Sequence, residues 1–471
     1  MRRIAIVSTV LGVLVVVAFV LMAPKDAAWK ADPADAVYDN PANWTSGSVP
    51  NGTAVFGASA QSDITFTRKR INHYRYPNGF RWDLEGWISA ASWRFDQGAG
   101  RYHFTIGAAS YPIDPTPRVP CTGERLRFTG AGIAIRAGHV SITNDSCLAF
   151  VSKSTAGSVS ISNNKWLDFW DGADAGSASI LNDNALRFHD SNARNAVITN
   201  NAELAFRGNS SADDAAILNN GRVWIIENST GGNAAIDNAT SDASVIFDRA
   251  RPSLGSIAGA GKVYLDKAQL SIGGNNQSTT FSGVISDSES HNDTEASLIK
   301  VGSGTLTLSG TNSYRGPTSV IGGVLVVDGS IATSRLTRVE RGGRVAGTGA
   351  IGSTQVAGGI LAPGAAERPG VLSVQGNLAF LRGATYVLRV DPTAASAVKV
   401  TNYAISQDAT LHVVFAPGSY GERKYKILEA SGGKFVGRFA PAITSVNLPA
   451  DLEATLSYEG YEVYLVLSAK G

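Results

Sequence analysis

Asp145 and Asp183 are the two carboxylates whose spacing would suit catalysis. Each stands three residues after an isoleucine of a repeat described below, and they are two repeats apart. If each repeat forms one coil of a stack, about 9.6 Å separates them, near the upper limit for the carboxylates of an inverting glycosidase. Asparagine holds the same position in three further repeats, at Asn164, Asn201 and Asn220. We therefore interpret the position as a polar corner and predict no catalytic residue.

A GxGxxG motif at Gly347, Gly349 and Gly352 has the spacing of a dinucleotide-binding loop. Such a loop needs a helix whose N-terminus points at the pyrophosphate. The next residues, STQVAGGILAPG, are rich in glycine and in strand formers, so we predict a corner between strands and no cofactor. The six histidines are scattered, and the sequence has no HExxH, CxxC or GxSxG motif. We therefore predict neither a metal site nor an enzyme.

Aromatic and basic residues beside the buried positions of one predicted strand are better placed for binding. Residues that flank an inward pair point outward, and exposed tryptophans beside arginines stack on sugar rings or bind a protein partner. The predicted binding residues are Trp166, Trp170, Arg187, His189, Arg207 and Trp224. Asp168 and Arg222 share this face. The alternative is an ordinary solvated surface, in which Asp168 and Arg187 form an ion pair between adjacent coils worth about 0–1 kcal/mol.

The strands that would position these residues recur about every 19 residues. Six isoleucines, each with an asparagine two positions later, are separated by 19, 19, 18, 19 and 19 residues. The isoleucines are Ile142, Ile161, Ile180, Ile198, Ile217 and Ile236, and the asparagines are Asn144, Asn163, Asn182, Asn200, Asn219 and Asn238. A leucine or valine and then a phenylalanine or isoleucine follow in each repeat, and the sixth repeat delays this pair by three residues, to Val245 and Phe247.

This period predicts a right-handed parallel β-helix. It is too short for a propeller blade and suits a coil that stacks about 4.8 Å above the previous one, so that like residues form columns. The isoleucine, leucine and phenylalanine columns would face the core. The asparagines would form a corner column, where amides bond along the stack and left-handed backbone is tolerated.

The segment KVGSGTLTLSGTNSYRGPTSVIGGVLVVDGS, from Lys300 to Ser330, resembles the strand repeat of autotransporter passenger domains, which Gram-negative bacteria export to their surface. NPANWTSGSVPNGTAVFG and LRFTGAGIAI are similar to the family's opening segments, and YKILEASGGKFVGRF with LSYEGYEVYLVL is similar to its C-terminal stem. The resemblance implies a β-helical passenger whose stem nucleates folding. The family's C-terminal membrane barrel is missing before Gly471, so we expect either a separate export barrel or retention at the inner membrane.

Composition agrees with an exported all-β protein. The 471 residues include 51 glycines, and only 17% are charged, with a formal net charge of +2, so we predict no nucleic-acid partner. Arg2 and Arg3 precede an apolar run over residues 4–23, which would be either a cleaved signal or an uncleaved anchor that contacts the membrane. Cys121 and Cys147, the two cysteines, would either form a disulfide or pack as small residues.

The predicted organisation is a signal or anchor (1–28), an N-terminal β region (29–120), the 19-residue repeats (121–250), the passenger strand repeat (251–355) and a C-terminal stem or cap (356–471). Within the stem, Leu456, Tyr458, Tyr461, Val463, Leu465 and Leu467 alternate as capping strands would. We predict a non-enzymatic surface stalk or adhesin that attaches to a surface glycan or to a protein of the host or a neighbouring cell. The alternatives are a glycan-processing β-helix enzyme and a periplasmic scaffold anchored at the inner membrane.

Overall fold

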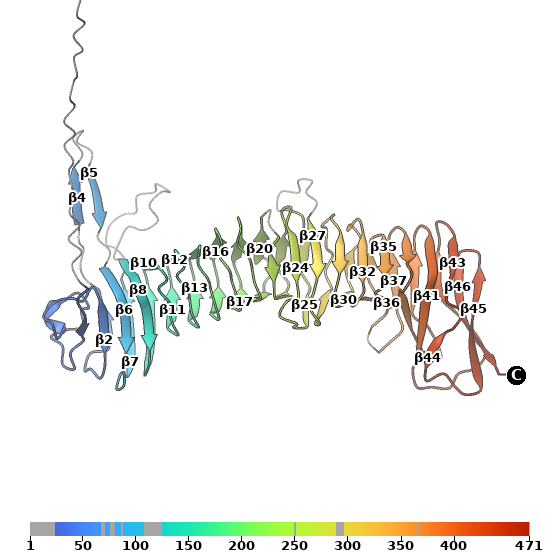
Figure 1. Ribbon diagram of the computed structural model, residues 1–471, viewed down its shortest axis with the longest axis horizontal. Coiled ribbons are helices and arrows are strands. Elements are labelled where there is room, and N and C mark those ends of the chain that lie inside the picture. Colours follow the sequence, from blue (N-terminus) through green and yellow to red (C-terminus); the bar gives the residue numbers. More distant parts are fainter. Residues whose placement is uncertain are drawn as a thin grey trace, which may run out of the picture.

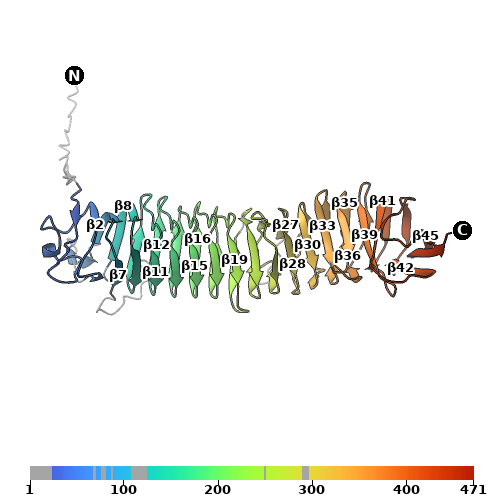
Figure 2. The same ribbon diagram turned by 90° about the horizontal axis from the view of Figure 1, so that it is seen from below.

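The chain forms a long rod of stacked β-strands (Figures 1 and 2). The computed structural model describes residues 24–66, 71–75, 81–85, 88–107, 125–248, 251–288, 296–365 and 367–470. Over these residues the one helical element is the short 3-10 helix η1 (Pro41–Asn43). The all-β prediction is confirmed, and the long parallel sheets are those of a β-helix. Its right-handedness stays a prediction, and the apolar run over 4–23 lies outside the described residues.

Four sheets of stacked strands make up the rod. The first sheet, in spatial order, contains β1 (Ala27–Ala28), β2 (Thr53–Phe56), β6 (Ile88–Phe95), β8 (Arg125–Ile135), β10 (Cys147–Phe150), β12 (Trp166–Trp170), β14 (Ala185–His189), β16 (Glu203–Arg207), β18 (Arg222–Ile225), β20 (Ser244–Phe247), β23 (Lys262–Tyr264) and β26 (Val284–Ser286).

The second sheet contains β3 (Asp63–Thr65), β7 (Arg101–Ile106), β9 (His139–Asn144), β11 (Ser160–Asn163), β13 (Ser179–Asn182), β15 (Val197–Asn200), β17 (Ala216–Asn219), β19 (Ala235–Asn238), β22 (Ser256–Gly259), β25 (Thr279–Phe281), β28 (Thr305–Leu308), β30 (Gly323–Val327), β33 (Gly343–Gly347), β36 (Ile360–Pro363), β39 (Thr385–Val390), β41 (Ala404–Phe415) and β44 (Thr444–Val446).

The third sheet contains β21 (Ser253–Leu254), β24 (Gln269–Ile272), β27 (Ser297–Lys300), β29 (Thr318–Val320), β32 (Thr337–Glu340), β35 (Thr354–Ala357), β38 (Leu378–Phe380), the first half of β41, and β43 (Phe435–Phe439). The fourth contains β31 (Ser330–Ile331), β34 (Ala350–Ile351), β37 (Val371–Val374), β40 (Ala397–Val400), β42 (Arg423–Ala430), β46 (Glu462–Ala469) and β45 (Leu452–Glu459). A separate antiparallel hairpin joins β4 (Ile71–Arg75) to β5 (Arg81–Glu85).

The core is a line of stacked apolar layers, as the repeat predicts. The six isoleucines pair in register along the second sheet and are at most 2% exposed. On the first sheet the rings of Phe128, Phe150, Phe169, Phe188 and Phe206 stack coil on coil, with neighbouring centroids 4.8–4.9 Å apart. The delayed pair of the last repeat keeps this register, because Val245 pairs with Val223 and Phe247 with Ile225. The predicted columns are confirmed.

The asparagine column is a buried hydrogen-bonded ladder at the ends of the second-sheet strands. All six side chains are fully buried. Each of the first five donates to the side-chain oxygen of the next, over 2.6–2.8 Å, and each amide also bonds a backbone carbonyl of the next coil. The predicted bonding along the stack is confirmed.

Left-handed backbone occurs at a different corner. None of the six asparagines has a positive φ, whereas Gly157, Gly176, Arg194, Asp213 and Gly232 form a column with φ between 48° and 64°. The expectation that left-handed backbone accompanies the asparagine corner is therefore wrong. They end extended strands, and this backbone directs their amides into the interior, where the bonds to the next coil form.

Both ends of the rod carry features that the 19-residue repeat does not predict. At the N-terminal end Tyr38, Trp44, Phe56 and Trp93 are fully buried in an aromatic cluster, in which the indole of Trp44 donates to the carbonyl of Tyr38 at 2.8 Å. At the other end β45 and β46 form an antiparallel hairpin that pairs with β42 (Figure 1).

The alternating strands predicted at the C-terminal end are largely as observed, while their capping role stays a prediction. Val463, Leu465 and Leu467 are buried, and Leu456 and Tyr458 pack partly against the core. Tyr461 differs, since it lies at the hairpin turn and is 47% exposed.

The GxGxxG segment is a corner between strands. Gly347 ends β33 with a φ of 116°, and β34 begins at Ala350, so no helix opens there. A Cβ on Gly347 would lie 2.1 Å from the carbonyl oxygen of Val327, which explains the need for glycine. In the part of the chain that the structure describes, no helix is long and apolar enough to cross a membrane.

Candidate functional site

The outward face of β12, β14, β16 and β18 brings the predicted binding residues together. In-register pairing places Trp170 beside His189 and His189 beside Arg207. A neighbouring row runs from Asp168 to Arg187 and, two coils further on, to Trp224. Trp166 lies in a third row, in the same strand as Asp168 and Trp170. The arrangement follows from the two-residue alternation of strands, because the intervening leucines and phenylalanines point inward.

Two planar contacts organise this face. The rings of Trp170 and His189 are stacked, with centroids 3.7 Å apart and planes inclined by 4°. The guanidinium of Arg187 lies over the ring of Trp166, with its Cζ 4.1 Å from the ring centroid. These contacts restrict the rings at the surface, and Trp170 remains 39% exposed. Trp224 is partly covered by Arg222, at 5.3 Å.

Asp168 is the electrostatic exception on the face. Its Oδ1 is buried and accepts no hydrogen bond, and the Nε of Arg187 is likewise buried without a partner. The ion pair between them that the alternative of a solvated surface implied is not formed, because Arg187 turns instead to Glu203 of the following coil, with Nη2 and Oε1 3.4 Å apart. Burial raises the pKa of Asp168 to about 6, an effect that the positive charge of Arg187 opposes.

His189 is held in its neutral form. Burial under Trp170 and the positive charges of Arg207 and Arg187 lower the pKa of His189 to about 4. A neutral imidazole stacked on an indole offers a ring surface together with one donor and one acceptor. The face therefore combines stacked rings with the cation of Arg207, which is the chemistry for holding a sugar ring or an acidic group.

Asp145 and Asp183 lie in a half-buried to exposed ladder of carboxylates and amides. Asp145 Oδ1 accepts from Asn164 and Asp183 Oδ1 from Asn201, each at 2.6 Å, and Asn220 continues the ladder by donating to Asn201. Each carboxylate thus accepts the amide of the next coil, as the corner interpretation predicts.

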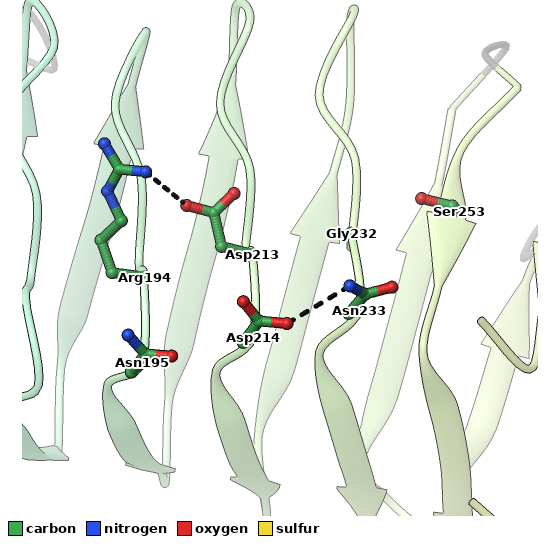
Figure 3. Close-up of a pocket in the computed structure, with 7 residues that line it drawn as sticks. All are labelled: Arg194, Asn195, Asp213, Asp214, Gly232, Asn233 and Ser253. Carbon is green, nitrogen blue, oxygen red and sulfur yellow. Dashed lines mark hydrogen bonds and ion pairs between the residues drawn. The ribbon is translucent and has the colours of Figure 1, made fainter. Parts of the chain in front are cut away.

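A polar groove at the left-handed corner was not found by sequence reasoning (Figure 3). Its volume is about 400 Å³, and its lining residues are Arg194, Asn195, Asp213, Asp214, Gly232, Asn233 and Ser253. Arg194 pairs with Asp213 at 3.5 Å, and Asn233 donates to Asp214 at 3.3 Å. Arg194 and Asp213 occupy positions where neighbouring coils have glycine. That substitution within the repeat is the signal that could have indicated the groove.

Of the two alternatives for the cysteines, a disulfide or packing as small residues, the structure shows the disulfide at Cys147. Cys147, at the start of β10, is disulfide-bonded. Cys121, the other cysteine of the sequence, lies outside the described residues.

The fold is an elongated parallel β-solenoid. Residues 298–327 match the family of the passenger-associated-transport-repeat, and they span β27, β28, β29 and β30 of this solenoid. No curated protein matches the chain. A passenger-associated-transport-repeat within a parallel-strand solenoid fits an autotransporter passenger domain, and it indicates an exported protein.

Proposed function

We propose that the chain is the rigid, non-enzymatic rod of an exported adhesin and that it attaches to surface glycans through the outward face of β12 to β18. The observation that carries the proposal is the stack of Trp170 on His189 beside Arg207. Sugars stack their C–H faces on such rings, and a nearby guanidinium adds hydrogen bonds to hydroxyl or carboxylate groups. A protein partner is the second candidate, because tryptophan and arginine also dominate protein interfaces.

The rod supports this role mechanically. Each coil repeats the same inward residues, so the outward residues stand in fixed rows along the axis and lose little freedom when a ligand binds. An acidic polymer would meet Arg187, Arg207 and Arg222 on successive strands of one sheet. No cofactor or metal enters the proposal.

Binding to a glycan array and to whole cells would test the proposal. Trp170→Ala and Arg207→Ala should each lower glycan binding about 5- to 30-fold, in line with about 1–2 kcal/mol for a stacking or charge-assisted contact. Tyr403→Ala is the matched control, since Tyr403 is an exposed aromatic residue between β40 and β41, outside the face of β12 to β18, and it should bind as the unmodified protein does. Binding to protein receptors alone would favour the second candidate, and unchanged binding in both variants would remove this face from consideration.

Two further experiments address the alternatives to an adhesin. Polysaccharide cleavage that is lost in the Asp145→Ala, Asp183→Ala double variant would establish the glycan-processing enzyme instead. Antibody labelling of intact cells, together with the mass of the mature N-terminus, would separate a surface rod from a periplasmic scaffold anchored through residues 4–23.

A further inference from the structure

The second sheet presents an outward surface unlike that of the first. Leu181 on β13, Val197 on β15 and Leu218 on β17 are 39%, 55% and 40% exposed. Pairing in register places Leu181, Thr199 and Leu218 in one row on three successive strands, and Val197 beside Ala216 in the adjacent row. Three large aliphatic side chains therefore share one exposed patch on neighbouring strands.

This patch lies within a long strip that is almost free of charge. On the described strands of the second sheet from β11 to β30, the outward residues other than Asp237 are serine, threonine, alanine, valine and leucine. Asp237 is the one charged residue among these outward positions. Eight coil steps of about 4.8 Å give the strip a length of about 38 Å. The outward face of β12 to β18 carries arginines, acids and tryptophans over the same coils.

We propose that the part of this strip from β11 to β19, centred on Val197 of β15, is the interface through which two copies of the chain associate face to face with their rods antiparallel. An uncharged flat surface is complementary to itself, because no like charges meet when it packs against a second copy. The outward residues of this strip offer no positive charge that could bind an acidic glycan, a nucleic acid or a lipid headgroup. Exposed aliphatic patches of this kind mark association surfaces, and a two-fold dimer is the simplest closed assembly.

The antiparallel arrangement follows from the position of Asp237. A two-fold axis along β15 places Val197 against Val197 of the second copy and Leu181 against Leu218 of the second copy. The two Asp237 side chains then lie two coils to either side of the axis, about 19 Å apart at about 4.8 Å per coil. A parallel arrangement would place both aspartates in the same layer of the interface, where their desolvation and mutual repulsion oppose association.

Sedimentation velocity of the full chain over a range of concentrations tests the proposal. The unmodified protein should form dimers, and Val197→Arg should weaken dimerisation at least about tenfold by bringing two buried guanidinium groups together. Val371→Arg is the matched control, because Val371 is an aliphatic residue of β37, 39% exposed, on the fourth sheet, and its dimerisation should be unchanged. A protein that is monomeric at every concentration, or an equal effect of both variants, would overturn the proposal.

Crosslinking provides a readout that does not depend on a destabilising variant. With a short bis-maleimide, Val197→Cys should link to itself, and a mixture of Leu181→Cys and Leu218→Cys chains should link to each other more than either links to itself. Self-linkage of Leu181→Cys in place of the mixed product would rule out the antiparallel arrangement.

Discussion

Asn163 donates a hydrogen bond to Asn182 across one coil step, with 2.7 Å between Nδ2 and Oδ1. Asn182 in turn donates to Asn200 at 2.7 Å and to the carbonyl of Glu203 at 2.9 Å. A single amide thus connects three coils inside the core. Because each member is fully buried, losing one leaves unsatisfied polar atoms on both neighbours.

Asn182→Leu should therefore lower the free energy of unfolding by about 1–3 kcal/mol. The loss should extend to adjacent coils, since solenoid coils are stabilised by their neighbours. Urea unfolding followed by circular dichroism measures the loss, and Asn201→Leu is the control, because Asn201 lies in the exposed ladder of the next coil. An unchanged midpoint for Asn182→Leu would contradict a structural role for the buried ladder.

Lys300 lies fully buried at the end of β27, within the matched repeat. Its Nζ donates to the carbonyl oxygens of Val301, Gly302 and Gly322, and burial lowers the pKa of this lysine. Lys300→Met should remove the shared donor and cost about 2–4 kcal/mol of unfolding free energy. Lys262→Met, at an exposed lysine of β23, should be within about 0.5 kcal/mol of the unmodified protein. Equal stability of the two variants would show that the carbonyls find other partners.

The ionisation of Asp168 should make the free energy of unfolding fall as the pH rises. Its pKa is raised to about 6 in the fold from about 3.9 in an unfolded chain. Between these values the folded chain binds the proton and the unfolded chain does not, so the stabilisation is complete below about pH 4 and is lost as the pH rises through about 6. Asp168→Asn cannot ionise and should raise the unfolding free energy above pH 6 by at most about 3 kcal/mol.

Urea titrations of Asp168→Asn and the unmodified protein at several pH values test this difference. The advantage of the variant should shrink as the pH falls toward about 4. His189 is present in both proteins, so its own titration cancels in the comparison. An advantage that is the same at all pH values would show that Asp168 does not titrate in this range.

The antiparallel hairpin of β45 and β46 should protect the end of the rod. Leu465 is fully buried where β46 pairs with β42. Leu465→Asp should detach the hairpin, expose the sheet edge at β42 and promote aggregation during refolding. Tyr461→Asp, at the exposed hairpin turn, should refold as the unmodified protein does. Light scattering during dilution from urea measures both, and soluble refolding of Leu465→Asp at the normal rate would argue against a capping role.

The sequence by itself determined the repeating coil of the β-helix. The repeated isoleucines, asparagines and phenylalanines revealed the period, the inward columns and the rows on the outward face, because in a parallel stack each residue meets its own equivalent one coil away. The same logic predicted the amide ladder along the stack and the shared face of Trp170, His189 and Arg207. Such neighbours are encoded locally, by the spacing along the chain.

Only the tertiary structure decided which contacts form at positions where neighbouring coils carry different residues. Arg187 turns to Glu203 in place of Asp168, and Arg194 and Asp213 adopt the left-handed backbone that glycine has elsewhere in their column. The aromatic cluster around Trp44 and Trp93 joins residues that belong to no common repeat. Side-chain length, desolvation and the geometry of the corners determine these partners. None of these can be read from the order of residues along the chain.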